Sequence, residues 1–177
     1  MIKKLGKCIG EYKKPSILSP IFISLEVLME VLIPLMMASL INNGIEKNDF
    51  PYVIKIGVLL LISATISLVF GALSGKYAAE ASAGFAKNLR KKMFYNVQTY
   101  AFSNIDKFSA SSIVTRLTTD VTNLQNAYQM IIRTVVRSPF MLIASLIFSF
   151  VISPKMTGIF LCIIPILGVG LYFIISH

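Results

Sequence analysis

Four long hydrophobic runs divide the sequence and form two pairs. The first pair covers residues 17–41 and 52–75, and the second covers residues 135–152 and 156–176. About 20 apolar residues in a helix cross the ~30 Å hydrocarbon core of a bilayer, because each residue adds ~1.5 Å. The pattern therefore predicts four membrane spans and an all-α integral membrane fold.

A long stretch at residues 76–134 separates the two pairs, and its apolar residues recur at helical spacing. In its first part these residues are Leu89, Met93, Val97 and Ala101. In its second part they are Ile113, Leu117, Val121, Leu124, Tyr128, Ile131 and, just beyond it, Val135. The spacing predicts two amphipathic helices, one continuing the second span and one leading without a break into the third. A continuous helix from Tyr52 to Tyr100 would be ~73 Å long, so about half of it would lie outside the bilayer.

Composition and charge give this topology a direction. The chain is 55% hydrophobic and 14% charged, which suits a protein surrounded by lipid. Of the net charge of +9, residues 1–14 carry +4, residues 76–137 carry +6, and all other residues sum to −1. Basic residues confined to every second connection indicate that those connections lie on the cytoplasmic side. We therefore expect a multi-pass plasma-membrane protein with a cytoplasmic N-terminus, and not a nucleic-acid-binding protein.

The N-terminal residues 1–14 form a segment of their own. Their lysines alternate with apolar residues, so an amphipathic elbow helix along the inner membrane surface is expected.

The chain holds no recognisable catalytic or metal-binding motif. Its one histidine is His177, and its cysteines, Cys8 and Cys162, lack metal-ligand spacing. The segment 71–77 superficially resembles a phosphate-binding loop, but it is one residue short, and Tyr77 replaces the required hydroxyl residue. Its small residues predict close helix packing instead. No catalytic residue, metal or cofactor is therefore expected within this chain.

Glu26 and Glu30 are the most informative polar residues of the spans. They lie one helical turn apart, and carboxylates inside a membrane are costly unless they face water or a partner. Two interpretations stay open: a polar lining of a substrate or ion pathway, or a pair that bonds to neighbouring helices. Arg133 and Arg137 are expected to anchor their helix at the inner membrane boundary.

The cytoplasmic stretch resembles the first intracellular loop of ABC exporters. Leu89, Arg90 and Phe94 match the first element of that pattern, and the segment 116–121 matches the last through Arg116, Leu117, Asp120 and Val121. In spacing alone, Arg116 and Asp120 also predict a surface ion pair. Ser111 stands where the family usually has glycine. Through Glu26, Glu30 and Pro34, the first span is similar to that of the ABC exporter branch whose members often form heterodimers.

The resemblance implies a fold and a partner set. Residues 15–177 would be part of an ABC exporter-type transmembrane bundle, with four of its six spans and two long helices extending into the cytoplasm. Because the sequence stops at His177 inside the fourth span, we expect it to be a fragment. The full protein would pair with a second subunit, identical or different, and would hydrolyse ATP with Mg at ATPase domains in cis or in trans.

The resemblance also implies a mechanism. A coupling helix at the tip of the loop would contact an ATPase domain and pass its movement to the long helices, which alternate access to a central cavity. The residues expected at this contact are Asp106, Ser109, Ala110, Ser111, Ser112, Ile113, Val114, Thr115 and Arg116.

Two other functions compete with this one. A gradient-driven secondary transporter or channel would use Glu26 and Glu30 as ion-coupling carboxylates. A non-transporting membrane scaffold or sensor would use the loop as a helical stalk. Neither requires an ATPase partner, and the secondary transporter leaves the long extramembrane helices unexplained.

Overall fold

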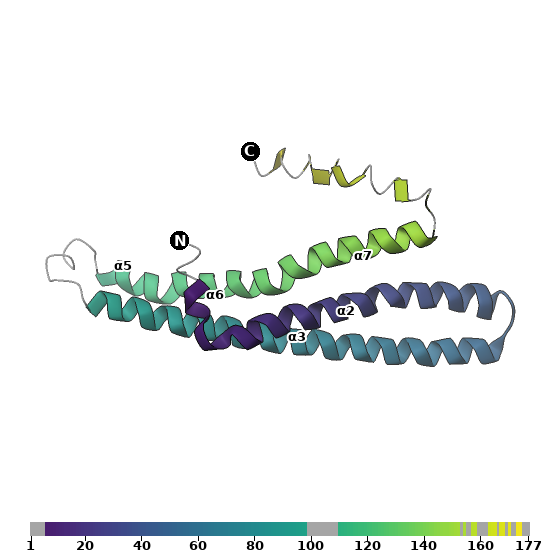
Figure 1. The fold of residues 1–177 in the computed structure, drawn as a ribbon, viewed down its shortest axis with the longest axis horizontal. Helices are drawn as coiled ribbons and strands as arrows, with labels where there is room; N and C mark the ends of the chain where they lie inside the picture. Colours follow the sequence, from purple (N-terminus) through teal and green to yellow (C-terminus); the bar gives the residue numbers. More distant parts are fainter. Residues whose placement is uncertain are drawn as a thin grey trace. The chain divides into compact units, whose positions relative to one another are not determined.

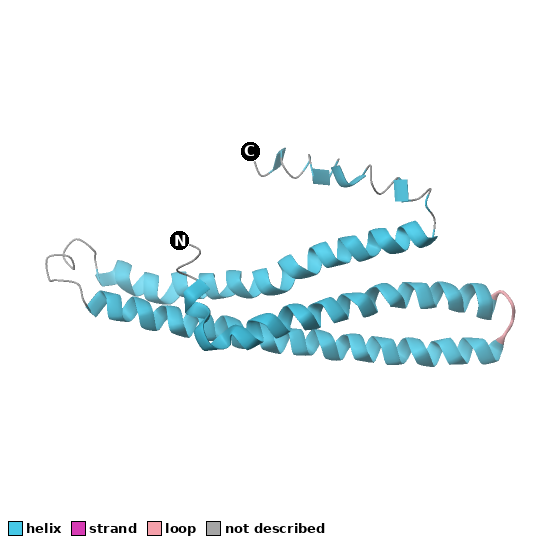
Figure 2. Ribbon diagram, in the orientation of Figure 1, coloured by secondary structure: helices cyan, strands magenta, loops and turns pink. Residues whose placement is uncertain are grey.

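The computed structural model describes residues 6–98 and 110–152, together with residues 154, 157–158, 163–165, 167–168, 170 and 173–174. These residues are almost entirely helical and include no strand, as the hydrophobic pattern predicts (Figure 2). The chain divides into two compact units, Met1–Arg137 and Ser138–His177.

The first unit is built on an antiparallel pair of helices. Helix α2 spans Lys13–Ser39, ends in the π-helical turn η2 at Leu40–Ile45, and is followed after a short turn by α3 at Phe50–Gln98 (Figure 1). Helix α3 is continuous over 49 residues, which confirms the expected over-long helix. Glycine, alanine and serine line its middle section, where Ser74, Ala78, Ala81 and Ser82 are fully buried.

A second long run of helix follows residue 110. It consists of α5 (Ala110–Thr115), the π turn η3 (Arg116–Asp120), α6 (Val121–Met130), the π turn η4 (Ile131–Val135) and α7 (Val136–Ile152). Pro139 lies inside α7 without ending it. Among the described residues, three helices are long and apolar enough to cross a membrane: Cys8–Ile45, Phe50–Gln98 and Ser111–Ile152.

The π turns correct one sequence-based expectation. The apolar face predicted by periodicity included Leu124, Ile131 and Val135, but all three are exposed, and Ile132 is buried. A π turn takes up one more residue than an α turn. The inward face therefore moves along the sequence by one position near η4.

The N-terminal segment packs against α3. It forms the 3₁₀ helix η1 (Lys7–Tyr12), interrupted at Gly10, whose φ of 51° is a left-handed conformation that glycine adopts readily. Asn88 of α3 donates a hydrogen bond to the carbonyl oxygen of Cys8 at 3.0 Å. The expected amphipathic elbow is thus a short, bent segment, and its place on the membrane surface stays a prediction.

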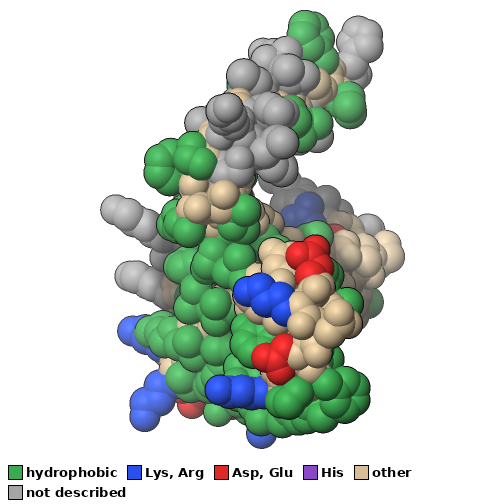
Figure 3. All heavy atoms as spheres, turned by 90° about the vertical axis from the view of Figure 1, so that its right-hand side faces the viewer, with side chains coloured by type: hydrophobic (Ala, Val, Ile, Leu, Met, Phe, Trp, Pro, Cys, Tyr) green, Lys and Arg blue, Asp and Glu red, His purple; other side chains and the backbone are tan. Residues whose placement is uncertain are grey.

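Two small clusters form the interior of the first unit. One joins Cys8, Phe85, Ala86, Leu89 and Val121, and the other joins Ala78, Ala81 and Ile132. Tyr128 packs on both clusters and stacks on Phe85 at 4.8 Å. Elsewhere large apolar side chains face outward, and hydrophobic atoms dominate the view in Figure 3. Such a surface suits contact with lipid or further helices.

The second unit holds most of α7 and the described part of the predicted fourth span. The described residues between 154 and 174 are helical, and Ser149 and Thr157 share a hydrogen bond of 3.2 Å. The remaining positions of the predicted span at 156–176 lie outside the described residues, so its limits stay a prediction.

Candidate functional site

The first feature of the site is an ion-paired cluster around Arg137. Its Nη2 donates to both carboxylate oxygens of Glu30, at 2.6 and 2.7 Å, and its Nη1 donates to Glu26 Oε1 at 3.2 Å. The two glutamates reach the same guanidinium because they lie one turn apart on α2. The side chains are only partly exposed, by 36% for Arg137, 29% for Glu30 and 12% for Glu26.

Helix α3 completes the surroundings of this cluster. The Glu26 carboxylate lies over Gly71, where an added Cβ would be 2.9 Å from Oε1 and 3.2 Å from Oε2. Glycine is therefore needed at this position for the close approach. Glu26 Oε2 is buried and has no hydrogen-bond partner among the described residues. The expectation that small residues in the segment 71–77 permit close packing is confirmed at Gly71.

Arg137 makes a contact beyond the anchoring role expected of it, because its guanidinium binds two carboxylates of α2. Its place at the inner membrane boundary stays a prediction. Arg133, one turn earlier, lies beside α3 with Nη1 3.7 Å from the Cβ position of Gly75. The contacts of Glu26 and Glu30 match the interpretation that they bond to a neighbouring helix. A pathway lining stays a prediction.

Hydrogen bonds between α2 and α3 fix the position of the two helices along each other, close to the cluster around Arg137. Ser19 Oγ donates to the carbonyl oxygen of Ser74 at 3.1 Å, and Ser74 Oγ donates back to that of Ser19 at 3.1 Å. Both serines are fully buried. Tyr128 of α6 donates a hydrogen bond to Ser16 Oγ at 2.8 Å, which joins α6 to the same part of α2.

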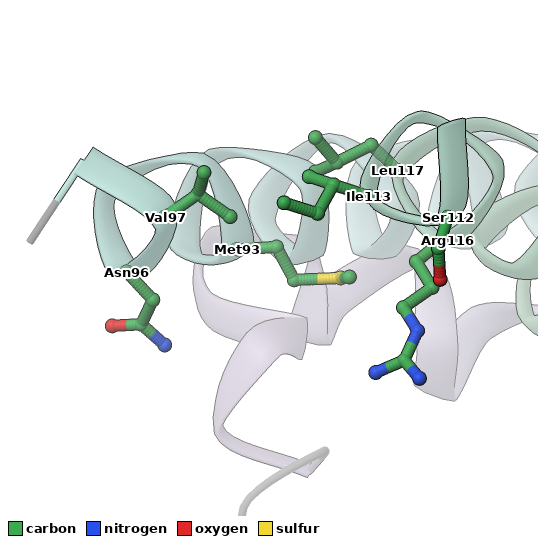
Figure 4. Close-up of a pocket in the computed structure, with 7 residues that line it drawn as sticks. All are labelled: Met93, Asn96, Val97, Ser112, Ile113, Arg116 and Leu117. Carbon is green, nitrogen blue, oxygen red and sulfur yellow. The ribbon is translucent and has the colours of Figure 1, made fainter. Parts of the chain in front are cut away.

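The second feature is a groove at the C-terminal end of α3. It has a volume of about 140 Å³ and lies between α3 and the α5–η3 segment. Figure 4 shows its lining, which is formed by Met93, Asn96, Val97, Ser112, Ile113, Arg116 and Leu117.

Some of the predicted coupling residues line this groove. Asp106 and Ser109 lie outside the described residues, whereas Ala110–Thr115 form α5 and Arg116 begins η3. Ser112, Ile113 and Arg116 line the groove, and Val114 is 59% exposed on another side of α5.

The surface ion pair expected between Arg116 and Asp120 is not formed. Ion pairs within the described part of the chain join Glu11 to Lys87 and Arg137 to the two glutamates. The α-helical spacing behind the expectation does not hold here, because both residues lie in the π turn η3. Arg116 instead contributes to the groove beside α3.

Comparison with known proteins identifies the architecture. The sequence pattern of the ABC transporter transmembrane region matches residues 16–177, which is nearly the whole chain. The chain belongs to this family. The resemblance drawn from the loop motifs is thereby confirmed, and the long helices are those of an ABC exporter-type transmembrane bundle.

Relatives of this ABC transmembrane region include much longer proteins. The ABC transporter ATP-binding protein YfiB of Bacillus subtilis is 34% identical over 166 residues, covering 92% of this chain and 29% of that protein. An ABC transporter ATP-binding protein of Mycobacterium tuberculosis is 29% identical over 151 residues, covering 85% of this chain and 26% of that protein. An ATP-dependent lipid A-core flippase of Albidiferax ferrireducens is 26% identical over 141 residues, covering 78% and 24%. The chain thus spans less than a third of the length of these relatives.

The contact of Arg137 with the two glutamates is the feature of this ABC transmembrane region that the sequence reasoning missed. A signal for it exists in the charge pattern. Two carboxylates in one span need a counter-charge, and Arg133 and Arg137 repeat the four-residue spacing of Glu26 and Glu30. Matching these two pairs by spacing would have pointed to an interhelical contact.

Proposed function

We propose that this chain is the membrane-spanning part of an ATP-driven exporter subunit. It forms half of a substrate pathway and couples that pathway to an ATPase domain, carried by the same polypeptide or by a partner. The names of the relatives, which include ATP-binding proteins and an ATP-dependent flippase, support this proposal.

One observation carries the proposal for coupling. Helix α3 and the α5–α6 segment extend side by side beyond the hydrophobic stretches, and their ends enclose the groove around Met93 and Ile113. A continuous helix of 49 residues transmits displacement over ~73 Å with little bending. The exposed face of α5 is then the contact for the ATPase domain, with Asp106 and Ser109 as further expected contacts. ATP and Mg act at that domain.

The alternative of a gradient-driven carrier finds less support. Family membership favours ATP-driven transport. Both carboxylates that would couple ions are bound to Arg137. The proposal that Glu26 and Glu30 border the pathway is compatible with their partial exposure, and it assigns Arg137 to the same border.

The test uses the full-length protein in membranes, with its own cysteines replaced. Cysteine is placed at Val114 or Ser111 on α5, and at the exposed Asn123 on α6 as a matched control. A short thiol crosslinker is expected to join the α5 cysteines, and not the control, to a cysteine on the ATPase domain, and nucleotide trapping is expected to change the yield. Equal yields from α5 and from Asn123 would refute the coupling contact. ATP-independent transport by the same protein would refute an ATP-driven exporter.

A further inference from the structure

Two charged pairs with the same spacing lie on helices that run in the same direction. Glu26 and Glu30 are four residues apart on α2, and Arg133 and Arg137 are four residues apart on the run from η4 into α7. Helix α2 and the segment around η4 run in one direction in Figure 1. For parallel helices with equal spacing, the simplest pairing is Glu26 with Arg133 and Glu30 with Arg137.

The described arrangement departs from that one-to-one pairing. Arg137 binds both glutamates, and Glu26 Oε2 is buried without a partner among the described residues. Arg133 forms no ion pair within the described part of the chain and lies instead beside Gly75. One carboxylate is thus short of a partner, while an arginine one turn away is available to it.

Helix α3 leaves room for a change of partner. Gly71 lies under the Glu26 carboxylate, and Gly75, one turn away, lies beside the Arg133 guanidinium. Neither position carries a Cβ that would separate the two side chains. At these two positions α3 therefore places no side chain against either group.

The backbone at Arg133 also permits a change of register. Arg133 lies in the π turn Ile131–Val135, directly before Arg137 and α7. Because a π turn holds one extra residue, its conversion to α-helix moves neighbouring side chains by one position while the backbone stays hydrogen-bonded. Displacements of one element past another by up to a helical turn are an established form of switching.

We infer that Glu26 exchanges Arg137 for Arg133 during the transport cycle, so that the two carboxylates and two arginines become paired one to one. The arrangement in the structure, in which Arg137 binds both glutamates, is one of the two states of this exchange. The inference rests on the proposed function, because ATP-driven movement of the cytoplasmic helices supplies the displacement. Arg133 is a positioning residue in this scheme and does not contact the ATPase site.

The first test compares two arginine variants in the full-length transporter, reconstituted in sealed lipid vesicles with its partner subunit. Arg137→Gln is expected to lower the thermal stability of the nucleotide-free protein, because it removes the partner of both glutamates. Arg133→Gln is expected to leave that stability unchanged and to lower transport-coupled ATP turnover roughly tenfold, the size of a typical coupling between sites. Arg133→Lys, which keeps the charge, is expected to retain most of the turnover.

Lys92→Gln on the exposed cytoplasmic end of α3 is the charge-matched control. If Arg133→Gln turns over ATP as Lys92→Gln does, the exchange is refuted while the proposed function stands. If the unaltered protein shows no ATP-driven transport, the proposed function itself fails.

The second test does not depend on how well Arg133→Gln folds. Spin labels are placed at Leu28 on α2 and Met130 on α6, which are exposed by 48% and 65%. Their separation in the otherwise unaltered transporter is measured without nucleotide and after trapping with ATP and vanadate. A change in the distance distribution is expected on trapping. Identical distributions in a protein that transports would overturn the exchange.

Discussion

Replacement of Gly71 by alanine tests how firmly the cluster around Arg137 holds Glu26. The new methyl carbon would lie 2.9 Å from Glu26 Oε1 and 3.0 Å from its Cδ. Ordinary non-bonded carbon contacts are ~3.5–4.0 Å, so the carboxylate has to retreat by roughly 0.5 Å or more. Its bond to Arg137, at 3.2 Å, opposes a free rotation of the side chain.

Two opposing effects set the size of the change in unfolding free energy. Alanine is favoured over glycine inside a helix by about 0.5–1 kcal/mol. Overpacking of a tight contact costs about 1–3 kcal/mol. We therefore expect Gly71→Ala to lower the free energy of unfolding by roughly 0.5–2 kcal/mol.

Helix α3 provides matched controls for this measurement. A Cβ at Gly57 would meet nothing within 4 Å, and one at Gly75 would meet Arg133 at an ordinary 3.7 Å. Alanine at either site should raise the unfolding free energy by about 0.5–1 kcal/mol, because only the propensity effect remains. Unfolding of the purified protein in mild detergent, titrated with a denaturing detergent and followed by circular dichroism, gives these differences.

A double-mutant cycle with Glu26→Ala isolates the contact itself. Once the carboxylate is absent, Gly71→Ala should become stabilising, like Gly57→Ala, which corresponds to an interaction of about 1–3 kcal/mol. Equal stabilisation of the unaltered protein by Gly71→Ala and Gly57→Ala would refute the tight contact between Gly71 and Glu26. Additive effects of the replacements at Gly71 and Glu26 would refute it as well.

Other contacts of the first unit give further predictions. Gly84→Ala places a methyl group against the Tyr12 ring that packs on this glycine, so the N-terminal segment should separate from α3. The Cys8 thiol, which is 5% exposed, should then react faster with maleimide. A labelling rate equal to that of the unaltered protein would contradict the packing. Ser19→Ala and Ser74→Ala should each cost about 0.5–1 kcal/mol and be nearly additive, because each hydroxyl donates to a backbone carbonyl that the other replacement leaves in place. A detergent unfolding titration of the two single variants and the double variant measures this, and a strongly non-additive result would indicate that the 3.4 Å contact between the hydroxyls dominates.

The helices themselves could be predicted from the sequence because the evidence for them is local. The apolar run from Tyr52 and the four-residue recurrence of Leu89 and Met93 lie on one continuous helix, and periodicity registers such a feature directly. The π turn at Ile131–Val135 could not be predicted in this way. Its single extra residue changes which side chain faces inward but leaves the composition of the segment unchanged, so periodicity assigns Ile131 to the apolar face although Ile132 is the buried residue.

The candidate site was predictable only in part. The costly carboxylates Glu26 and Glu30 stand out in an apolar run, so their importance follows from the sequence alone. Their partner follows less readily, because Arg137 is more than 100 residues away and lies among basic residues that are also expected at the cytoplasmic boundary. Gly71 likewise gives no local sign that it makes room for Glu26.

The separation of the carboxylates from Arg137 along the chain has a consequence for biogenesis. Arg137 follows Glu26 by 111 residues and Glu30 by 107 residues. At ~5–20 residues per second, the ribosome needs about 5–20 s to produce that length of chain. The first span therefore enters the membrane with two carboxylates whose cation has not yet been synthesised. Helix α3 is made earlier than Arg137, so the contact of Glu26 with Gly71 can form before the ion pair and is the first to remove this carboxylate from the lipid.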